Sequence, residues 1–391
     1  MASHLLLAAI VVAIFIKEAE AGASYNVKKF GAKPDGITDS SMPFMSAWSA
    51  ACGSAKPATI YVPKGEYLVG ALRFQGPCNN QAIMVRIDGT LVAPSYQVLG
   101  SAKHWLLFNQ VDGLTIQGGT IDGQGADLWA CKSSDSENCP RGATSLSIFN
   151  SNHVMVNGLT SVNSQMFHIV INGCNDLWML GVTVVAPGDS PNTDGIHVQY
   201  SNGVTIRNSK LRTGDDCVSI GPGSTNLLVE NVACGPGHGI SIGSLGKEFN
   251  EEGVQNVTVR RVAFKGTQNG LRIKSWARPS SGFVNNVMFQ KAIMKNVQNP
   301  IIIDQNYCPH HDNCPSEQSG VKISNVMYQE IYGISATKVA VKFDCSEDNP
   351  CRGITMQDVN LRYKDELTLA SSYCMNVGGK AFGVINPASC L

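Results

Sequence analysis

Short hydrophobic segments recur along most of the chain, each introduced by a turn-forming residue such as Asn or Asp. Apolar residues alternate with polar ones in these segments, which are residues 112–116, 152–156, 175–179, 202–206, 226–230, 255–259, 285–289 and 324–328. A period of two predicts strands with one buried face. The segments recur every 23 to 40 residues, a spacing typical of a β-solenoid.

A second series of possible strands lies between members of the first. Its segments carry aliphatic residues at their third and fifth positions and align without gaps; they are residues 194–198, 216–220, 238–242, 269–273 and 299–303. Two interleaved strand series predict coils stacked into a right-handed parallel β-helix, which is an all-β fold. The competing solenoid, a leucine-rich repeat, would need a Leu-x-x-Leu-x-Leu signature that the sequence lacks.

The N-terminal region departs from this pattern. Residues 40–52 predict a short helix that caps the first coil, with one apolar face formed by Phe44, Ala47, Trp48 and Ala51. No Pro- or Ser-rich linker divides the remainder, so we expect residues 22–391 to form one β-helix domain. Before it, an apolar run of 12 residues from Leu5 to Ile16 is too short to span a bilayer. Because the run leads to Ala19-Glu-Ala21, a small-x-small cleavage site, residues 1–21 predict a secretory signal.

Composition supports a secreted globular protein. The 391 residues are 43% hydrophobic and only 15% charged, which is enough for a large core. The formal net charge is zero, so no general basic character indicates nucleic-acid binding, and no further apolar stretch indicates a membrane span.

Thirteen cysteines fit an oxidising compartment. No Cys-x-x-Cys spacing supports the alternative of a zinc site. Five candidate disulfides join cysteines close in sequence, and Cys52 with Cys78 could make a sixth; the five are Cys131–Cys139, Cys217–Cys234, Cys308–Cys314, Cys345–Cys351 and Cys374–Cys390. The odd count leaves one thiol, which we expect to be Cys174.

Candidate chemistry gathers where the second strand series begins. Asp194, Asp216 and His238 hold the first position of successive segments, 22 residues apart each time, and Asp215 immediately precedes Asp216. If each interval is one coil, these residues are about 5 Å apart per step. Two cations, Arg272 and Lys274, fall in or just after the next segment of the series and would lie on the same face of consecutive coils.

Simpler interpretations of these residues exist. Single Asp-Gly pairs are most often turn residues, a lone histidine such as His238 is usually a hydrogen-bonded turn residue, and Arg272 and Lys274 could simply balance charge. Asp194 and Asp216 also share the parity of the buried aliphatic positions, and two carboxylates in a dry core would be costly. We therefore expect a bend before each strand. Crowded carboxylates repel, and the resulting acid and base are what glycosidic cleavage requires.

Four short motifs carry a family resemblance. Residues 192–194 (Asn-Thr-Asp), 214–216 (Gly-Asp-Asp), 237–239 (Gly-His-Gly) and 272–274 (Arg-Ile-Lys) together resemble the signature motifs of the polygalacturonases, glycoside hydrolase family 28. The resemblance extends from about Tyr25 to the C-terminal cysteines. The spelling of the motifs is similar to the plant branch, and most of all to pollen exopolygalacturonases, some of which are allergens.

The resemblance implies roles for matching residues. Asp215 would be the general acid, while Asp194 and Asp216 would hold and deprotonate the attacking water, so that the anomeric carbon is inverted. His238 would support the acid or bind substrate. Binding of galacturonate would fall to four residues, Asn192, Arg272, Lys274 and Tyr307. The resemblance implies no metal and no cofactor, and a substrate of unbranched homogalacturonan in the plant cell wall.

Several alternatives stay open. Exo action is favoured by the pollen-type resemblance, but endo action is not excluded by the motifs, and a rhamnogalacturonan-cleaving relative is possible. A pectate lyase would instead use calcium and an arginine base, and it would release unsaturated products. A binding protein with an inactive site is the rival from another class. Asn256 begins a glycosylation sequon, and a capped solenoid is expected to be a monomer.

The cysteines carry one prediction. A disulfide bond between Cys217 and Cys234 would link two neighbouring coils next to Asp215 and His238. Replacing both cysteines by serine should therefore lower activity more than stability, as measured by reducing-end release and thermal unfolding. Unchanged turnover in the Cys217→Ser, Cys234→Ser double variant would contradict this role.

Overall fold

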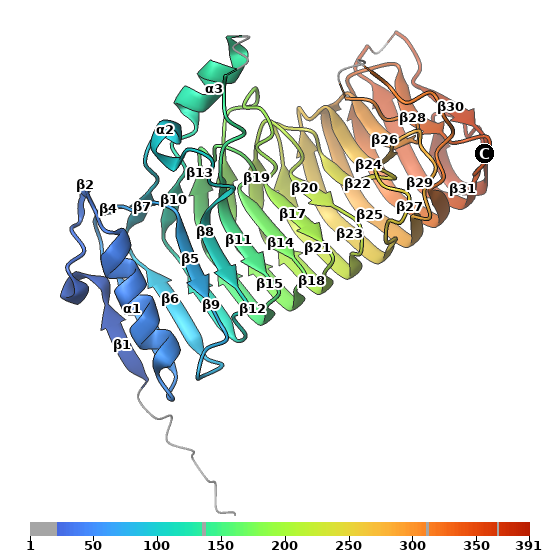
Figure 1. Cartoon of the computed structure of the whole chain (residues 1–391). Coiled ribbons are helices and arrows are strands. Elements are labelled where there is room, and N and C mark those ends of the chain that lie inside the picture. The colour runs from blue at the N-terminus through green and yellow to red at the C-terminus, as the bar shows by residue number, and fades with distance from the viewer. Residues whose placement is uncertain (1–21, 135–137, 310–312, 366) are drawn as a thin grey trace, which may run out of the picture.

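The computed structural model describes residues 22–134, 138–309, 313–365 and 367–391. The expected secretory signal, residues 1–21, lies outside the described residues. The strands pair in parallel as the chain winds through successive coils (Figure 1), so the expected parallel β-helix is confirmed. The described strands form two long sheets.

The first sheet has twenty described strands. They are β1 (Ala23–Asn26), β2 (Asp35–Asp39), β3 (Ala58–Val62), β4 (Glu66–Leu68), β6 (Ile83–Ile87), β7 (Thr90–Val92), β9 (Leu114–Gln117), β10 (Thr120–Asp122), β12 (Asn152–Asn157), β13 (Thr160–Val162), β15 (Asn175–Leu180), β16 (Thr183–Val185), β18 (Asn202–Arg207), β19 (Lys210–Arg212), β21 (Thr225–Cys234), β23 (Val254–Lys265), β25 (Phe283–Val297), β27 (Lys322–Ser335), β29 (Cys351–Tyr363) and β31 (Val377–Asn386). Because β21 pairs with both β18 and β19, this sheet contains two adjoining halves joined at a corner.

The second sheet has eleven described strands and is called here the groove sheet. They are β5 (Leu72–Gln75), β8 (His104–Asn109), β11 (Thr144–Phe149), β14 (Ile169–Asn172), β17 (Ile196–Gln199), β20 (Val218–Ile220), β22 (Ile240–Leu245), β24 (Asn269–Ser275), β26 (Asn299–Asp304), β28 (Val339–Asp344) and β30 (Ser371–Met375).

The observed register of the groove sheet matches the gap-free alignment of the sequence segments. Val218 pairs with Ile240, Ile240 with Leu271, and Leu271 with Ile301. These aliphatic side chains are fully buried in one continuous core that runs through the coils. Stacking like residues on like residues therefore fixes the register, because a slip by one residue would expose every aliphatic side chain.

Several turn residues of the first strand series are asparagines with a left-handed backbone conformation. Asn226, Asn256 and Asn286 all have a positive φ, between 54 and 58°, a conformation that Asn tolerates better than most residues. Their side chains form a ladder: Asn256 donates to Asn226 at 3.0 Å, and Asn286 donates to Asn256 at 2.8 Å. Asn256 is exposed in this ladder, and its glycosylation stays a prediction.

Helix α1 (Ser41–Gly53) begins and ends one residue later than the sequence predicts. Its four expected apolar residues are buried, and the indole of Trp48 donates to the carbonyl of Gln75 at 3.2 Å. The helix thus covers the first coils, next to the 3-10 helix η1 (Val27–Phe30). Two more helices, α2 (Tyr96–Leu99) and α3 (Ala126–Ser133), project beyond the coils (Figure 1). No helix among the described residues is long and apolar enough to cross a membrane.

All six cysteine pairs expected from the sequence are disulfide-bonded in the structure. Cys174 is the free cysteine of the described residues and is fully buried. Burial raises the pKa of its thiol to about 11, so it is a structural rather than a reactive group.

Tyr328 generates a stability prediction. Its ring is fully buried and stacks on Phe289 with centroids 5.1 Å apart, yet its hydroxyl has no hydrogen-bond partner among the described residues. Tyr328→Phe should therefore raise the free energy of unfolding by about 1 kcal/mol, since the cost of burying an unpaired hydroxyl disappears. Denaturant unfolding with the disulfides intact measures this. Tyr328→Leu, which loses the ring, is the control and should destabilise; a destabilised Tyr328→Phe would refute the prediction.

Candidate active site

The chain bends before two strands of the groove sheet. Strand β17 begins at Ile196 and β20 at Val218, and the residues before each, Gly195 and Cys217, form bends. Asp194 and Asp216 therefore precede the strands, as expected. The alternation of buried and exposed positions within the strands does not apply to them, so it does not direct their side chains into the apolar core. Both side chains nevertheless stay buried, at 6% and 1% exposed.

Asp216 lies at the centre of a buried ionic cluster. Its Oδ1 accepts hydrogen bonds from Arg272 Nη2 and Ser241 Oγ, both at 2.8 Å. Its Oδ2 accepts one from Lys274 Nζ at 2.8 Å. Arg272 Nε also donates to Ser241 Oγ at 2.9 Å, which closes the cluster. Arg272 and Lys274 share the face with the carboxylates as expected, but they are buried rather than solvated.

The cluster keeps Asp216 ionised. Burial alone would raise its pKa, but the charges of Lys274 and Arg272 outweigh burial and lower the pKa to about 2. A buried carboxylate is stable only when paired in this way.

Asp194 has the opposite environment. Its Oδ2 accepts one hydrogen bond from Ser219 Oγ at 2.7 Å. Burial and the negative charges of Asp215 and Asp216 raise its pKa well above the ordinary range. Ser219 Oγ in turn lies 2.7 Å from His197 Nδ1, and His197 Nε2 lies 3.2 Å from Gln199 Oε1.

Asp215 and His238 form the more open part of the site. His238 Nδ1 lies 2.9 Å from Asp215 Oδ1, which also accepts the Asp216 backbone N–H at 2.8 Å. The side chains are 19% exposed for Asp215 and 36% for His238. Asp215 is therefore the carboxylate of the three that a ligand can reach most directly.

A groove of about 480 Å³ opens beside this cluster. Its walls include His238, Arg272 and Tyr307. The Tyr307 ring covers both cations, with Lys274 Nζ 5.1 Å and the Arg272 guanidinium carbon 5.9 Å from its centroid. Asn192 lies exposed at a turn, with φ of 56°, two residues before Asp194.

Sequence reasoning missed two serines and a histidine that position the carboxylates. His197, Ser219, Ser241 and Arg272 are successive register partners on four strands. They occupy the fourth position of the aligned segments, so the alignment itself held the signal. It was overlooked because serine and histidine are common on exposed strand faces.

Asp215, Asp216 and His238 bring potential metal ligands within 4.8 Å of one another. The donor set nevertheless fits a divalent cation poorly. Asp216 already accepts three hydrogen bonds, and two of them come from the fixed cations Arg272 and Lys274. A metal ion there would have to displace or repel both.

Comparison with known proteins agrees with this geometry. The model of glycosyl hydrolases family 28 matches residues 52–390, and a model described as rhamnogalacturonase A/epimerase, pectate lyase-like, matches residues 24–72. The chain therefore belongs to the polygalacturonase family, glycosyl hydrolases family 28.

Similar proteins include plant enzymes. A polygalacturonase of Prunus persica is 60% identical over 94% of this chain and 93% of its own length. An exopolygalacturonase of Platanus acerifolia is 46% identical over 91% of this chain and 94% of its own length. Among solved structures, a hyperthermoactive exopolygalacturonase from Thermotoga maritima has a TM-score of 0.74 over 90% of this chain and 91% of that one. At 21% identity it shows the fold alone.

The raised pKa of Asp194 predicts a pH-dependent cost to stability. Between the ordinary and the raised pKa, the folded chain binds more protons than the unfolded chain, so stability falls as pH rises through this window. Asp194→Asn removes that cost. Its free energy of unfolding should exceed that of the wild type by an amount that grows as pH rises above about 4.

Denaturant unfolding from pH 4 to 8 measures the difference. The matched control is Asp216→Asn, which strands Arg272 and Lys274 without their partner and should destabilise by about 3–5 kcal/mol at neutral pH. A stability difference between Asp194→Asn and wild type that does not change with pH would disprove the assignment.

Proposed function

We propose that this protein is a secreted, exo-acting, inverting polygalacturonase that cleaves α-1,4-galacturonosyl linkages of homogalacturonan. The observation that carries the proposal is the unlike environment of three adjacent aspartates. Asp216 is held ionised by two cations, Asp194 has a raised pKa, and Asp215 is partly exposed beside His238, which lines the groove. Neighbouring carboxylates with different proton affinities can divide the roles of acid and base.

Asp215 is the general acid in this mechanism. It is the most exposed of the three carboxylates, and its hydrogen bond to His238 holds the carboxyl group in one orientation. It gives its proton to the glycosidic oxygen as the bond to the leaving sugar breaks.

Asp194 and Asp216 activate water on the opposite side of the sugar. A base with a higher pKa takes a proton more readily, so Asp194 is the proton acceptor once it is ionised. Both oxygens of Asp216 are engaged by cations, which suits it to orient the water. Attack on the face opposite the leaving group inverts the anomeric carbon.

Arg272, Lys274 and Tyr307 bind the substrate carboxylate. Two of the five Arg272 N–H groups are used inside the cluster, which leaves donors for a carboxylate in the groove that Arg272 lines. Tyr307 covers both cations and supplies a flat surface for a sugar ring. Asn192, which is exposed two residues before Asp194, is also assigned to substrate binding.

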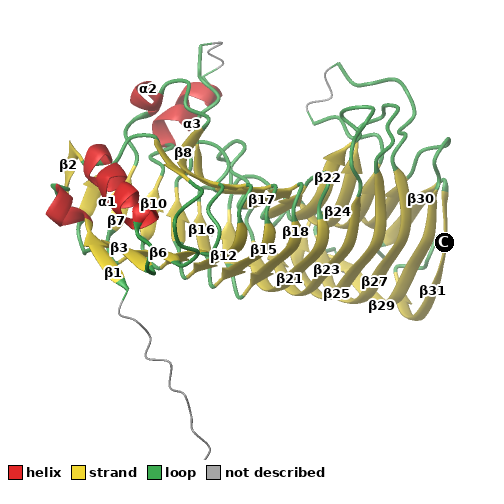
Figure 2. Ribbon diagram, turned by 60° about the horizontal axis from the view of Figure 1, so that its bottom comes forward, coloured by secondary structure: helices red, strands yellow, loops and turns green. Residues whose placement is uncertain are grey.

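Two observations support exo action. The similar Platanus acerifolia protein is an exopolygalacturonase. In addition, α3 and the described residues 305–309 and 313–321, which lie between β26 and β27, rise on either side of the strands that carry the cluster (Figure 2). Side chains of such segments would limit how far a polymer extends along the groove. Six disulfides support secretion, because such bonds persist outside the cytosol.

The first test is product chromatography on polygalacturonate at mildly acidic pH, with viscosity followed in parallel. Monomer from the start with slowly falling viscosity supports an exo enzyme, whereas mixed oligomers with rapid thinning identify an endo enzyme. Asp215→Asn should lose about 10²–10⁴-fold in turnover, because it removes the acid step. The exposed Lys322→Gln is the control and should keep full activity. No reducing ends from the wild type would leave only the binding-protein alternative.

A further inference from the structure

A second groove follows the coils on a face other than the groove sheet. It consists of two hollows of about 460 and 660 Å³ on the outer surface of the strands from β19 to β29. Ile293 lines the first hollow and Tyr332 the second, and these two residues are register partners on adjacent strands. The hollows therefore adjoin and form one surface, here called the lateral groove.

Basic side chains dominate this groove. It is lined by five cations, Lys210, Arg261, Lys291, Arg362 and Lys364. Two further lysines, Lys265 and Lys295, lie exposed as register partners on the same strands. Because the chain as a whole has no net charge, this face is a local concentration of positive charge.

Two acids border the groove. Glu330 lies 3.9 Å from Lys291 and offsets part of its charge. Asp365 lines the second hollow, and among the described residues its carboxylate accepts hydrogen bonds only from neutral groups, the Leu367 amide and the Thr368 hydroxyl. The buried Glu230 is shared by three arginines, Arg207, Arg260 and Arg261, which leaves two positive charges uncompensated at the corner of the sheet.

At the corner of the sheet, one residue of each coil has a left-handed backbone, with φ between 52 and 55°. Asn208 and Asn231 come first in this row, followed by Arg261 and Lys291, and then by the acids Glu330 and Asp358. The basic part of the row is therefore confined to β23 and β25.

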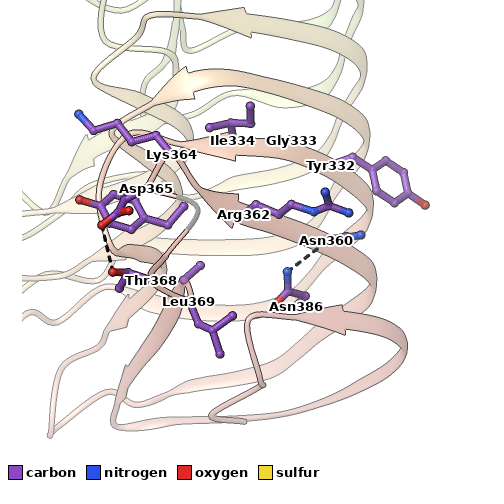
Figure 3. Close-up of a pocket in the computed structure, with 12 residues that line it drawn as sticks. Tyr332, Gly333, Ile334, Asn360, Arg362, Lys364, Asp365, Thr368, Leu369 and Asn386 are labelled. Atoms are coloured by element: carbon purple, nitrogen blue, oxygen red, sulfur yellow. Dashed lines mark hydrogen bonds between the residues drawn. The ribbon is translucent and has the colours of Figure 1, made fainter.

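Between the cations the floor is small or apolar. Ala233, Ala263, Ile293 and Tyr332 are successive register partners, so one residue from each coil lies along the axis of the helix. Ile293 and Tyr332 are 42% and 39% exposed. Figure 3 shows the Arg362 guanidinium directed toward the side of the hollow from which Tyr332 projects.

We propose that the lateral groove binds a segment of acidic polysaccharide, namely homogalacturonan outside the catalytic groove, and so docks the enzyme on its polymer. Strands β19, β23, β25 and β29 contribute cations to this face, and a polymer with one carboxylate per sugar can pair with several of them at once. Ile293 and Tyr332 offer apolar surface to the sugar rings. The proposal rests on the proposed function for the identity of the polymer.

The test neutralises the groove without touching the catalytic cluster. Lys210, Lys291, Arg362 and Lys364 are all exposed and are changed together to Gln. The control changes Lys28, Lys29, Lys33 and Lys64, exposed residues near the N-terminal helices, to Gln, so that both variants lose four positive charges. Both carry Asp215→Asn, so that the polymer is not degraded while binding is measured by affinity electrophoresis in polygalacturonate gels.

The groove variant should bind long polygalacturonate about tenfold more weakly than the control, equivalent to about 1.4 kcal/mol over four exposed ion pairs. With Asp215 restored, both should hydrolyse galacturonate trimers at the wild-type rate, because none of the altered side chains lines the groove beside Asp216. Equal binding by the two variants would overturn the proposal, and so would retention of polyglutamate as tight as that of polygalacturonate. The binding assay does not depend on turnover. If the protein does not hydrolyse polygalacturonate, the activity assay shows this independently of the binding result.

Discussion

Each coil of this protein must place its aliphatic side chains directly beside those of the preceding coil, because one continuous hydrophobic core runs through all the coils. The paired rows Val218, Ile240, Leu271 and Ile301 show this constraint in the groove sheet. A strand that slipped by one residue would bury polar groups and expose apolar ones along its whole length. The register also decides which outward-facing polar side chains lie next to one another on adjacent coils. The candidate active site therefore depends on it.

The buried ionic cluster around Asp216 depends on that register, which brings together residues far apart in sequence. Asp216 and Lys274 are 58 residues apart in the chain but form a buried ion pair at 2.8 Å. Burying two cations costs free energy, which their ion pairs with Asp216 and the hydrogen bond from Arg272 to Ser241 offset. Asp194, with no cation of its own, keeps a high proton affinity only a coil away. Asp194 and Asp216 occupy equivalent positions of successive coils, but their surroundings raise the pKa of one and lower the pKa of the other.

The same repetition creates the lateral groove, where cations from several coils gather on one face. Lys265 and Lys295 are neighbours across one strand pairing, and like charges at that spacing repel. The arginines around Glu230 show how the sheet corner tolerates such crowding, because one buried carboxylate compensates part of it. A solenoid can therefore hold two unlike polar surfaces over one apolar core, each set by a different row of outward residues.

The sequence alone determined the solenoid, the helix at its N-terminal end and the residues of the acid cluster, because all of these follow from periodicity and from residue types at repeated positions. It also indicated the cysteine pairs, which lie near one another in the chain. Only the tertiary structure decided that Arg272 and Lys274 are buried against Asp216, that Ser219 and His197 support Asp194, and that Arg261, Ile293 and Tyr332 share a groove. Periodicity gives the row in which a residue lies, whereas the direction and burial of its side chain depend on bends and neighbouring coils that no local pattern contains.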